Sequence, residues 1–152
     1  MNNKQDIRVD KVSSRVRQTA MILFCLLCAA FPLAATPVFS LYDLTCEQEH
    51  NPIGIETQRP CFSWKTYAEE RGFIQSAYQI LVSDMPETLK QDKGNVWNSG
   101  KVKSAQSVLT PYTGKPLKSS AIYYWKVRTW DKKGKPSEWS AVQTFTMGLP
   151  NA

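Results

Sequence analysis

Two pairs of glutamates are the side chains whose types could carry acid–base chemistry in this sequence. Glu69 and Glu70 stand beside an Arg-Gly pair typical of a hairpin tip, so we expect both carboxylates to point apart into solvent. Glu47 and Glu49 could share one face of a strand, but a small β domain offers no deep pocket around them. Hydrolysis by two carboxyl groups requires them to face each other across a cleft. Neither pair predicts such a cleft.

His50 is the only histidine, so a base-activated nucleophile would depend on it alone. It leads directly into an Asn-Pro turn, which predicts a histidine exposed at the surface. Metal ligation with Glu49 or Cys46 is the alternative, but one histidine with scattered carboxylates does not form a recognisable ligand spacing. The sequence also contains no glycine-rich phosphate loop and no nucleophile elbow. It therefore predicts a chain that is not itself an enzyme and that holds no metal or cofactor.

The first 35 residues have the pattern of a secretory signal peptide, with cleavage expected between about residues 35 and 40. Five basic residues precede an apolar run over Ala20–Phe31, and small residues follow it. A membrane-spanning helix needs about 20 apolar residues, so a transmembrane anchor is the weaker alternative. No small residue stands before Cys25 or Cys28, which argues against a lipid anchor. We therefore expect an exported protein, periplasmic or extracellular, without a transmembrane span once the leader is removed.

Half of the net positive charge belongs to this leader. The 152 residues carry 19 Lys and Arg against 13 Asp and Glu, for a formal charge of +6. Cleavage after Ala35 would leave 14 basic and 11 acidic residues, and the remaining lysines are scattered. No segment gathers them into a stripe that follows phosphates, so composition argues against nucleic acid as a partner. With 42% hydrophobic and 11% aromatic residues, the chain has enough apolar surface for one packed domain.

Short strands run through the remaining sequence. Seven runs alternate or are rich in β-branched and aromatic residues: Leu41–Glu47, Cys61–Thr66, Ser76–Ser83, Asn95–Val102, Ser107–Tyr112, Ala121–Trp130 and Trp139–Met147. Only Met85–Lys90, with Pro86 at a first helical position, offers a helical turn, so crossover helices for a parallel sheet are lacking. The sequence therefore predicts an all-β, seven-stranded antiparallel sandwich over residues 41–149, followed by a truncated linker at 150–152.

The alternation in Ala121–Trp130 assigns its side chains to two faces. We expect the uncharged set to face the core and the charged set to face outward; the sets are Tyr123, Trp125, Val127 and Thr129, and Tyr124, Lys126, Arg128 and Trp130. Trp139 arrives on the next strand, so cations and rings can interleave on the outer face. This possible interaction face comprises Tyr124, Lys126, Arg128, Trp130 and Trp139. It could be a stabilising cation–π stack, a sugar-stacking platform or a docking face for another domain.

Two cysteines, Cys46 and Cys61, remain after removal of the leader, and export would permit a bridge between them. The alternation of inward and outward side chains along the two strands argues against this disulfide. Cys46 shares its parity with Leu44, the expected inward residue, whereas Cys61 is out of step with the inward pair Phe62 and Trp64. A bulge near Pro60 could still bring the two thiols together, so the sequence leaves both states open.

The end of the chain resembles a fibronectin type III module. Tyr123 follows Leu117 by six residues, Trp125 and Val127 continue in step, and a glycine turn then leads to Ser137-Glu138-Trp139-Ser140. The resemblance implies that Tyr123 is the corner tyrosine, whose hydroxyl bonds back to the backbone near Leu117. It also implies that Trp64 is the buried early tryptophan. Trp64, Leu117, Tyr123 and Trp125 are therefore expected to be structural.

A longer resemblance is carried by seven segments in order: CEQEHNPIGIETQRPCFSW, QSAYQILVS, VWNSGKV, YTGKPL, YYWKVRTWD, SEWS and TFTMG. Together they resemble the N-terminal β-sandwich of bacterial α-L-rhamnosidases over Leu41–Leu149. One departure is Cys61, where the family suggests a basic residue. In that family a helical barrel far downstream performs catalysis, and nothing in this sequence matches its catalytic carboxylates.

The resemblance implies a non-catalytic accessory module of an exported α-L-rhamnosidase, which we expect to be a fragment lacking the catalytic barrel. Its partner would be the catalytic domain of the parent glycosidase, which the module would brace and orient. The alternative is a free-standing fibronectin-like module that binds rhamnose-containing glycans or another exported protein through the face around Tyr124, Trp130 and Trp139.

Overall fold

The structure is a computed structural model, and it describes residues 39–149. These residues lie within one compact unit that spans Pro37–Ala152. The predicted leader, its cleavage site and the predicted linker at 150–152 lie outside the described residues.

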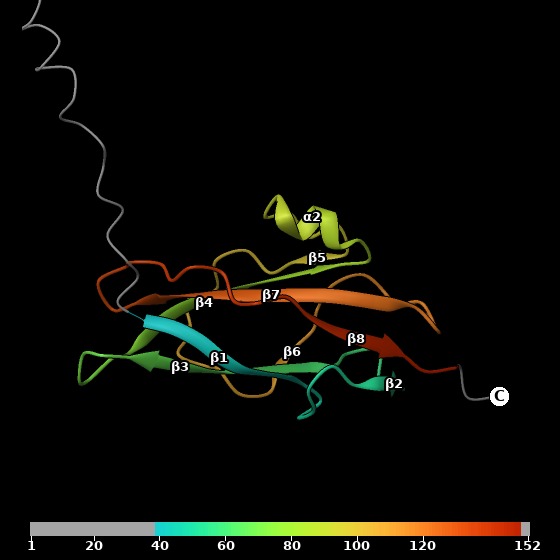
Figure 1. The fold of residues 1–152 in the computed structure, drawn as a ribbon, viewed down its shortest axis with the longest axis horizontal. Coiled ribbons are helices and arrows are strands. Elements are labelled where there is room, and N and C mark those ends of the chain that lie inside the picture. Colours follow the sequence, from blue (N-terminus) through green and yellow to red (C-terminus); the bar gives the residue numbers. More distant parts are fainter. Residues whose placement is uncertain (1–38, 150–152) are drawn as a thin grey trace, which may run out of the picture. The chain divides into compact units, whose positions relative to one another are not determined.

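Two β-sheets pack face to face and form a sandwich (Figure 1). The three-stranded sheet has the order β1 (Phe39–Cys46), β3 (Cys61–Ala68) and β6 (Thr110–Pro111). The five-stranded sheet has the order β2 (Ile53–Ile55), β8 (Gln143–Met147), β7 (Ile122–Asp131), β4 (Gln75–Ser83) and β5 (Trp97–Asn98). The predicted all-β sandwich is confirmed, with eight strands in place of seven.

The additional strand, β2, pairs parallel to β8, so the sheet is not purely antiparallel as predicted. Sequence patterns missed it because Pro52 and Gly54 are turn formers, and Gly54 has a φ of +84°. A three-residue strand of this kind carries no alternation of its own. Its hydrogen bonds to β8 hold it in the sheet.

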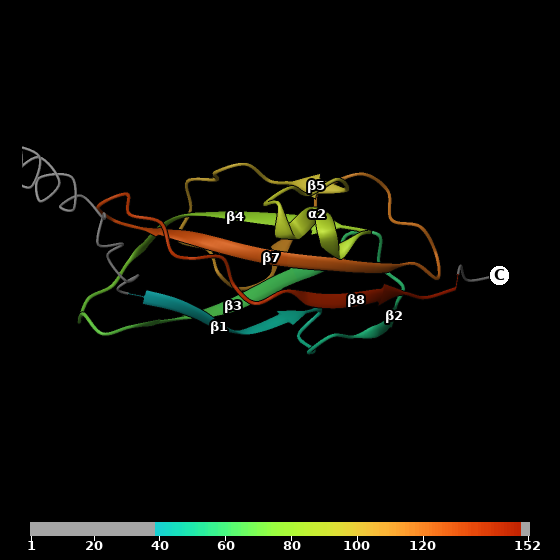
Figure 2. The same cartoon turned by 45° about the horizontal axis from the view of Figure 1, so that its top comes forward.

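Three predicted strands are shorter than expected. Asn95–Val102 contributes only β5 and an isolated bridge from Val102 to Tyr78. Ser107–Tyr112 contributes only β6, and the last strand begins at Gln143 and not at Trp139. The helical turn is present as α2 (Pro86–Lys90), with its proline in the first turn. It lies on the side of the five-stranded sheet that faces away from β1, β3 and β6, as two views show (Figures 1 and 2).

Aromatic side chains from both sheets fill the space between them. The inward set of β7 is buried as predicted, with Trp125 and Val127 fully enclosed. Phe62 from β3 contacts Trp125, with 4.5 Å between the ring centroids. Trp64 is also buried, and its indole N–H donates to the Gln75 side-chain oxygen at 3.1 Å. Because the polar indole atom is satisfied, the ring can contribute its large apolar area to the core.

Tyr123 ties the loop before β7 to the core. Its ring is buried, and its hydroxyl accepts a hydrogen bond of 2.8 Å from the Lys118 backbone N–H. Leu117, next to this bond, is also buried. This is the contact that the tyrosine-corner interpretation requires. The bond fixes the path of the chain as it enters the central strand.

The two described cysteines are free thiols. Cys46 points into the core beside Leu44, and the strand register pairs it with Phe62 and not with Cys61. Cys61 is half-buried at the start of β3. Burial raises the pKa of the Cys46 thiol well above its ordinary value, and that of Cys61 in the same direction.

Replacing Tyr123 with Phe is expected to lower the free energy of unfolding by about 1–2 kcal/mol, because the Lys118 N–H loses its partner at a partly buried site. Urea unfolding of residues 37–152 measures this change. Tyr42→Phe is the matched control, because Tyr42 is half exposed on β1 and its change should alter stability by less than about 0.5 kcal/mol. Equal effects of the two substitutions would contradict the structural role of Tyr123.

Native alkylation is expected to modify Cys61 much faster than Cys46, because Cys46 is only 1% exposed and its thiolate is strongly disfavoured. After unfolding, both thiols should react, which intact-mass measurement can count. A mass lower by two hydrogens after folding under mild oxidation, with no alkylation in denaturant, would instead demonstrate a bridge.

Candidate functional site: the outer face of the five-stranded sheet

The outward side chains of β7 lie on the face predicted from the sequence, but several are not open to solvent. Lys126 is 5% exposed and Trp130 is 7% exposed, although both point away from the core. Tyr124 and Arg128 are half-buried. A second layer therefore covers much of this face. It consists of α2 and the segment before β8.

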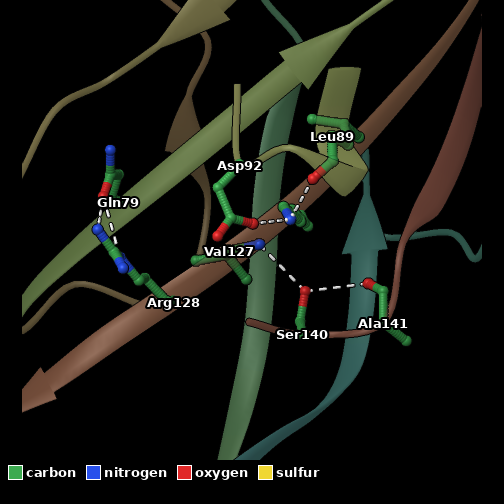
Figure 3. Close-up of polar contacts among 8 residues, drawn as sticks. Gln79, Leu89, Asp92, Val127, Arg128, Ser140 and Ala141 are labelled. Atoms are coloured by element: carbon green, nitrogen blue, oxygen red, sulfur yellow. Dashed lines mark hydrogen bonds and ion pairs between the residues drawn. The ribbon is translucent and has the colours of Figure 1, made fainter. Parts of the chain in front are cut away.

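The segment before β8 is bonded to the free edge of β7. β8 pairs with β7 only over Ile122–Trp125, so the N–H groups further along need other partners. The Ser140 hydroxyl accepts from the Val127 N–H at 3.0 Å, and the Ser137 hydroxyl accepts from the Thr129 N–H at 3.1 Å. The backbone N–H groups of Ser137 and Ser140 donate in return to the Thr129 and Val127 carbonyls, each at 2.8 Å. Figure 3 shows the Ser140 contact.

This arrangement carries Trp139 onto the outer face, where cations and rings alternate. The Arg128 guanidinium carbon lies 4.5 Å from the Trp139 ring centroid and 4.9 Å from that of Trp130. The Lys126 ammonium lies 4.8 Å from Trp139, and that of Lys101 lies 4.5 Å from Trp130. We call these five residues the cation–indole stack. Contacts of this kind are stabilising, more so where the cation is desolvated.

A row of amides holds Arg128 in place across the sheet. Its Nε and Nη2 atoms both donate to the Gln79 side-chain oxygen on β4, at 3.0 and 2.8 Å. Gln79 in turn donates to the Asn98 side-chain oxygen on β5 at 2.8 Å. Figure 3 shows the paired contacts between Gln79 and Arg128. The guanidinium plane is therefore fixed between the two indoles by two directed bonds.

Lys126 holds the C-terminal end of α2 against the sheet. Its ammonium donates to the Leu89 carbonyl and to an Asp92 carboxylate oxygen, each at 2.5 Å. The hydrogen bond from Lys126 lowers the pKa of Asp92, and the nearby Trp139 indole acts in the same direction. A buried ammonium requires such partners, because desolvation without them is costly.

The predicted interaction face is thus divided. Lys126, Arg128, Trp130 and Trp139 come together in the stack, whereas Tyr124 lies apart on β7 opposite Ser83. The stacking alternative is the one that the contacts support, because each tryptophan ring already lies against at least one cation.

Sequence reasoning missed the partners of the stack. Gln79 could have been found, because it faces outward between the inward residues of its strand. Asp92 and Lys101 come from loops, and no periodic pattern places a loop residue on a sheet face.

The carboxylates and the histidine considered first do not form a reaction centre. Glu47 accepts a 2.6 Å hydrogen bond from the Cys61 N–H, so it has a structural role. His50 is exposed, and its Nε2 atom lies 3.2 Å from Asp43. The Lys65 ammonium, 2.6 Å from Asp43, lowers the pKa of that carboxyl. Glu70 approaches only Lys133, at 4.0 Å, where both side chains are exposed.

The described residues form neither a metal-binding cluster nor a membrane-spanning helix. Among residues 39–149, no group of three or more His, Cys, Asp or Glu side chains could hold a metal ion. No helix in this range is long and apolar enough to cross a membrane.

The chain matches a family model described as "Rha78A-like, N-terminal immunoglobulin domain" over residues 41–151. The chain belongs to this family. The match spans both sheets of the sandwich and the residues of the cation–indole stack. The resemblance inferred from the sequence segments is confirmed.

Relatives of this module are α-L-rhamnosidases of much greater length. The chain is 50% identical over 99 residues to an α-L-rhamnosidase of Formosa agariphila, covering 65% of this chain and 10% of that relative. It is 42% identical over 106 residues to one of Streptomyces avermitilis, covering 70% of this chain and 10% of that relative. The chain therefore spans about a tenth of the curated relatives it matches.

Solved structures of α-L-rhamnosidases likewise match this chain over a small part of their length. The α-L-rhamnosidase from Dictyoglumus thermophilum superposes with a TM-score of 0.71 at 45% identity, over 74% of this chain and 12% of that chain. The Streptomyces avermitilis α-L-rhamnosidase, solved with L-rhamnose, gives a TM-score of 0.70 at 40% identity, over 73% and 11%. The immunoglobulin-like module is one small part of these enzymes, and their catalytic domain is separate from it.

Replacing Asp92 with Asn is expected to lower the free energy of unfolding by about 1–2 kcal/mol at neutral pH, a modest value because Asp92 is more than half exposed. The folded-state pKa of Asp92 is lowered, so its contribution is present above about pH 4 and is lost as the pH falls through the folded-state value. The difference between wild type and variant should therefore narrow in acid. Urea titrations at several pH values measure it.

Glu138→Gln is the control, because Glu138 is exposed in the same segment as Trp139 and should change stability little at any pH. A difference between wild type and Asp92→Asn that stayed constant down to about pH 2 would contradict the ionic contribution of Asp92.

Proposed function

We propose that this chain is the non-catalytic N-terminal accessory module of an exported α-L-rhamnosidase, and that it braces and orients the catalytic domain of that enzyme. The observation that carries the proposal is the family match over residues 41–151, together with relatives of 42–50% identity that are α-L-rhamnosidases of about ten times the matched length. The parent enzyme would act on L-rhamnosides.

The geometry supports a bracing function over a catalytic one. The cation–indole stack closes much of the outer face of the larger sheet, and the bonds from Ser137 and Ser140 complete the edge of β7. Within residues 39–149, the carboxylates considered for acid–base chemistry serve backbone bonds or lie in solvent. A closed and rigid sandwich is suited to hold a neighbouring domain at a fixed orientation.

Export is part of the proposal and rests on the sequence. The basic segment, the apolar run Ala20–Phe31 and the small residues that follow have the order of a secretory leader. The parent protein would accordingly be periplasmic or extracellular.

Immunoblotting of the source cells and their secreted fraction tests the proposal, with an antibody raised against residues 37–152. The expected result is a band far above the 17.2 kDa of this chain, located outside the cytoplasm. Competition with the purified module is the control for specificity. A band only at the size of the module would contradict the proposal and would favour a free-standing binding module.

A further inference from the structure

One edge of the five-stranded sheet exposes large apolar side chains that the second layer leaves uncovered. Ile53 on β2 is 87% exposed, Ile122 on β7 is 52% exposed, and Leu149 after β8 is 77% exposed. Ile53 and Ile122 both pair in register with Thr146 of β8, so they flank it on the same face, roughly 10 Å apart. We call Ile53, Ile122 and Leu149 the isoleucine edge.

The backbone beneath this edge is held rigidly. The Thr146 N–H donates to the Pro52 carbonyl at 2.9 Å, and the Gly148 N–H donates to the Ile55 carbonyl at 2.7 Å. The Thr144 N–H donates to the Asn51 side-chain oxygen at 2.8 Å. These contacts attach β2 to the last strand of the module, and Figure 1 shows the two side by side. Flexibility therefore does not explain the exposure of Ile53.

Close backbone approach at this point requires glycine. A Cβ atom at Gly148 would lie 3.1 Å from the Gly54 carbonyl oxygen, which is tighter than ordinary van der Waals contact. Gly54 itself adopts a φ of +84°, which side chains rarely accept. Ile53 therefore points into solvent from a backbone segment that the close approach of Gly54 and Gly148 holds in place.

Acidic side chains line one side of the edge. An open groove along β2 is bordered by Glu47, Glu49 and Glu56, together with Ile53 and Ile55. An apolar centre with a charged rim is the composition of a protein–protein contact surface. Charge complementarity requires a partner that offers apolar side chains flanked by Lys or Arg.

We infer that the isoleucine edge is the contact surface for the domain that follows this module in an α-L-rhamnosidase chain. The inference rests on the proposed function and specifies which part of the module meets its neighbour. The chain leaves β8 directly through Leu149, so a domain that follows is delivered to this edge. In the relatives about nine tenths of the length lies outside the matched module, which supplies such a domain.

A second exposed apolar surface provides a matched control. Tyr42 and Tyr67, 50% and 59% exposed, lie on the outer face of the three-stranded sheet. Their exposure is comparable to that of the isoleucine edge, but they belong to the opposite layer of the sandwich. A partner that required only an apolar surface could use either face.

The experiment uses the full-length Formosa agariphila α-L-rhamnosidase, in which residues 37–151 of this chain replace the segment that matches them, so that β1 is kept whole. Limited proteolysis between the module and the rest of the enzyme reports how often the two separate. The test variant carries Ile53→Ser with Ile122→Ser, and the control variant carries Tyr42→Ser with Tyr67→Ser. A third variant, Glu56→Lys, reverses one charge of the rim. All three are also made in the isolated module.

The test variant is expected to raise the cleavage rate at least tenfold, because each substitution removes apolar area from the contact between the module and the following domain. Glu56→Lys should raise it in the same direction, and the tyrosine variant should match the unaltered chimera. In the isolated module, the melting temperature should fall no more for the isoleucine variant than for the tyrosine variant, because both sets of side chains are solvent-exposed there.

The outcomes separate the two proposals. An unaltered chimera that is cleaved at once, or whose module melts independently of the enzyme, would overturn the proposed function and the inference with it. A stable unaltered chimera whose cleavage is unaffected by the isoleucine substitutions, or is accelerated by the tyrosine substitutions instead, would leave the proposed function intact and overturn the assignment of the surface.

Discussion

The structure depends on the way in which the free edge of β7 is completed. β8 covers only the first part of this strand, so the remaining N–H and C=O groups would be left without partners next to a packed core. Ser137 and Ser140 supply both hydroxyl and backbone bonds to Val127 and Thr129. An irregular segment thereby replaces a strand, and Trp139 is delivered to the outer face as a consequence.

The two faces of β7 then perform different tasks. Its inward aromatic residues pack against Phe62 and Phe145, whereas its outward cations stack with indoles and hold α2. An outward lysine that is 5% exposed would be costly if it stood alone. The Leu89 carbonyl and the Asp92 carboxylate make its burial tolerable. The second layer and the sheet therefore stabilise each other, and this closes a surface that could otherwise have bound a ligand.

Because the outer face of the five-stranded sheet is largely covered, a partner must bind to other surfaces of the module. A module that covers much of the outer face of its larger sheet with its own cations and rings leaves a partner to use its other exposed surfaces. The isoleucine edge is one of them, and its two isoleucines flank β8, the last strand of the sandwich. A rigid module with a defined contact at its exit can set the orientation of a neighbouring domain without taking part in chemistry.

Local patterns in the sequence were sufficient for the features that depend on neighbouring residues. The alternation of β7 identified its inward and outward sets, and Pro86 marked the start of α2. The resemblance to a fibronectin type III module, carried in part by the spacing from Leu117 to Tyr123, implied the corner bond to the backbone. The segments quoted for the rhamnosidase module were long enough to identify its family. The first three signals each lie within about ten residues, and the family signal is a series of short continuous segments.

Features that depend on distant segments were decided only by the tertiary structure. The parallel pairing of β2 was hidden because Pro52 and Gly54 indicate a turn, and only contact with β8 makes a strand of them. The partners Gln79 and Asp92 reach Arg128 and Lys126 through register and loop path, which no local period records. The outward face was predicted but its burial was not, because side-chain direction follows from the pleat whereas solvent exposure depends on what the rest of the chain places above it.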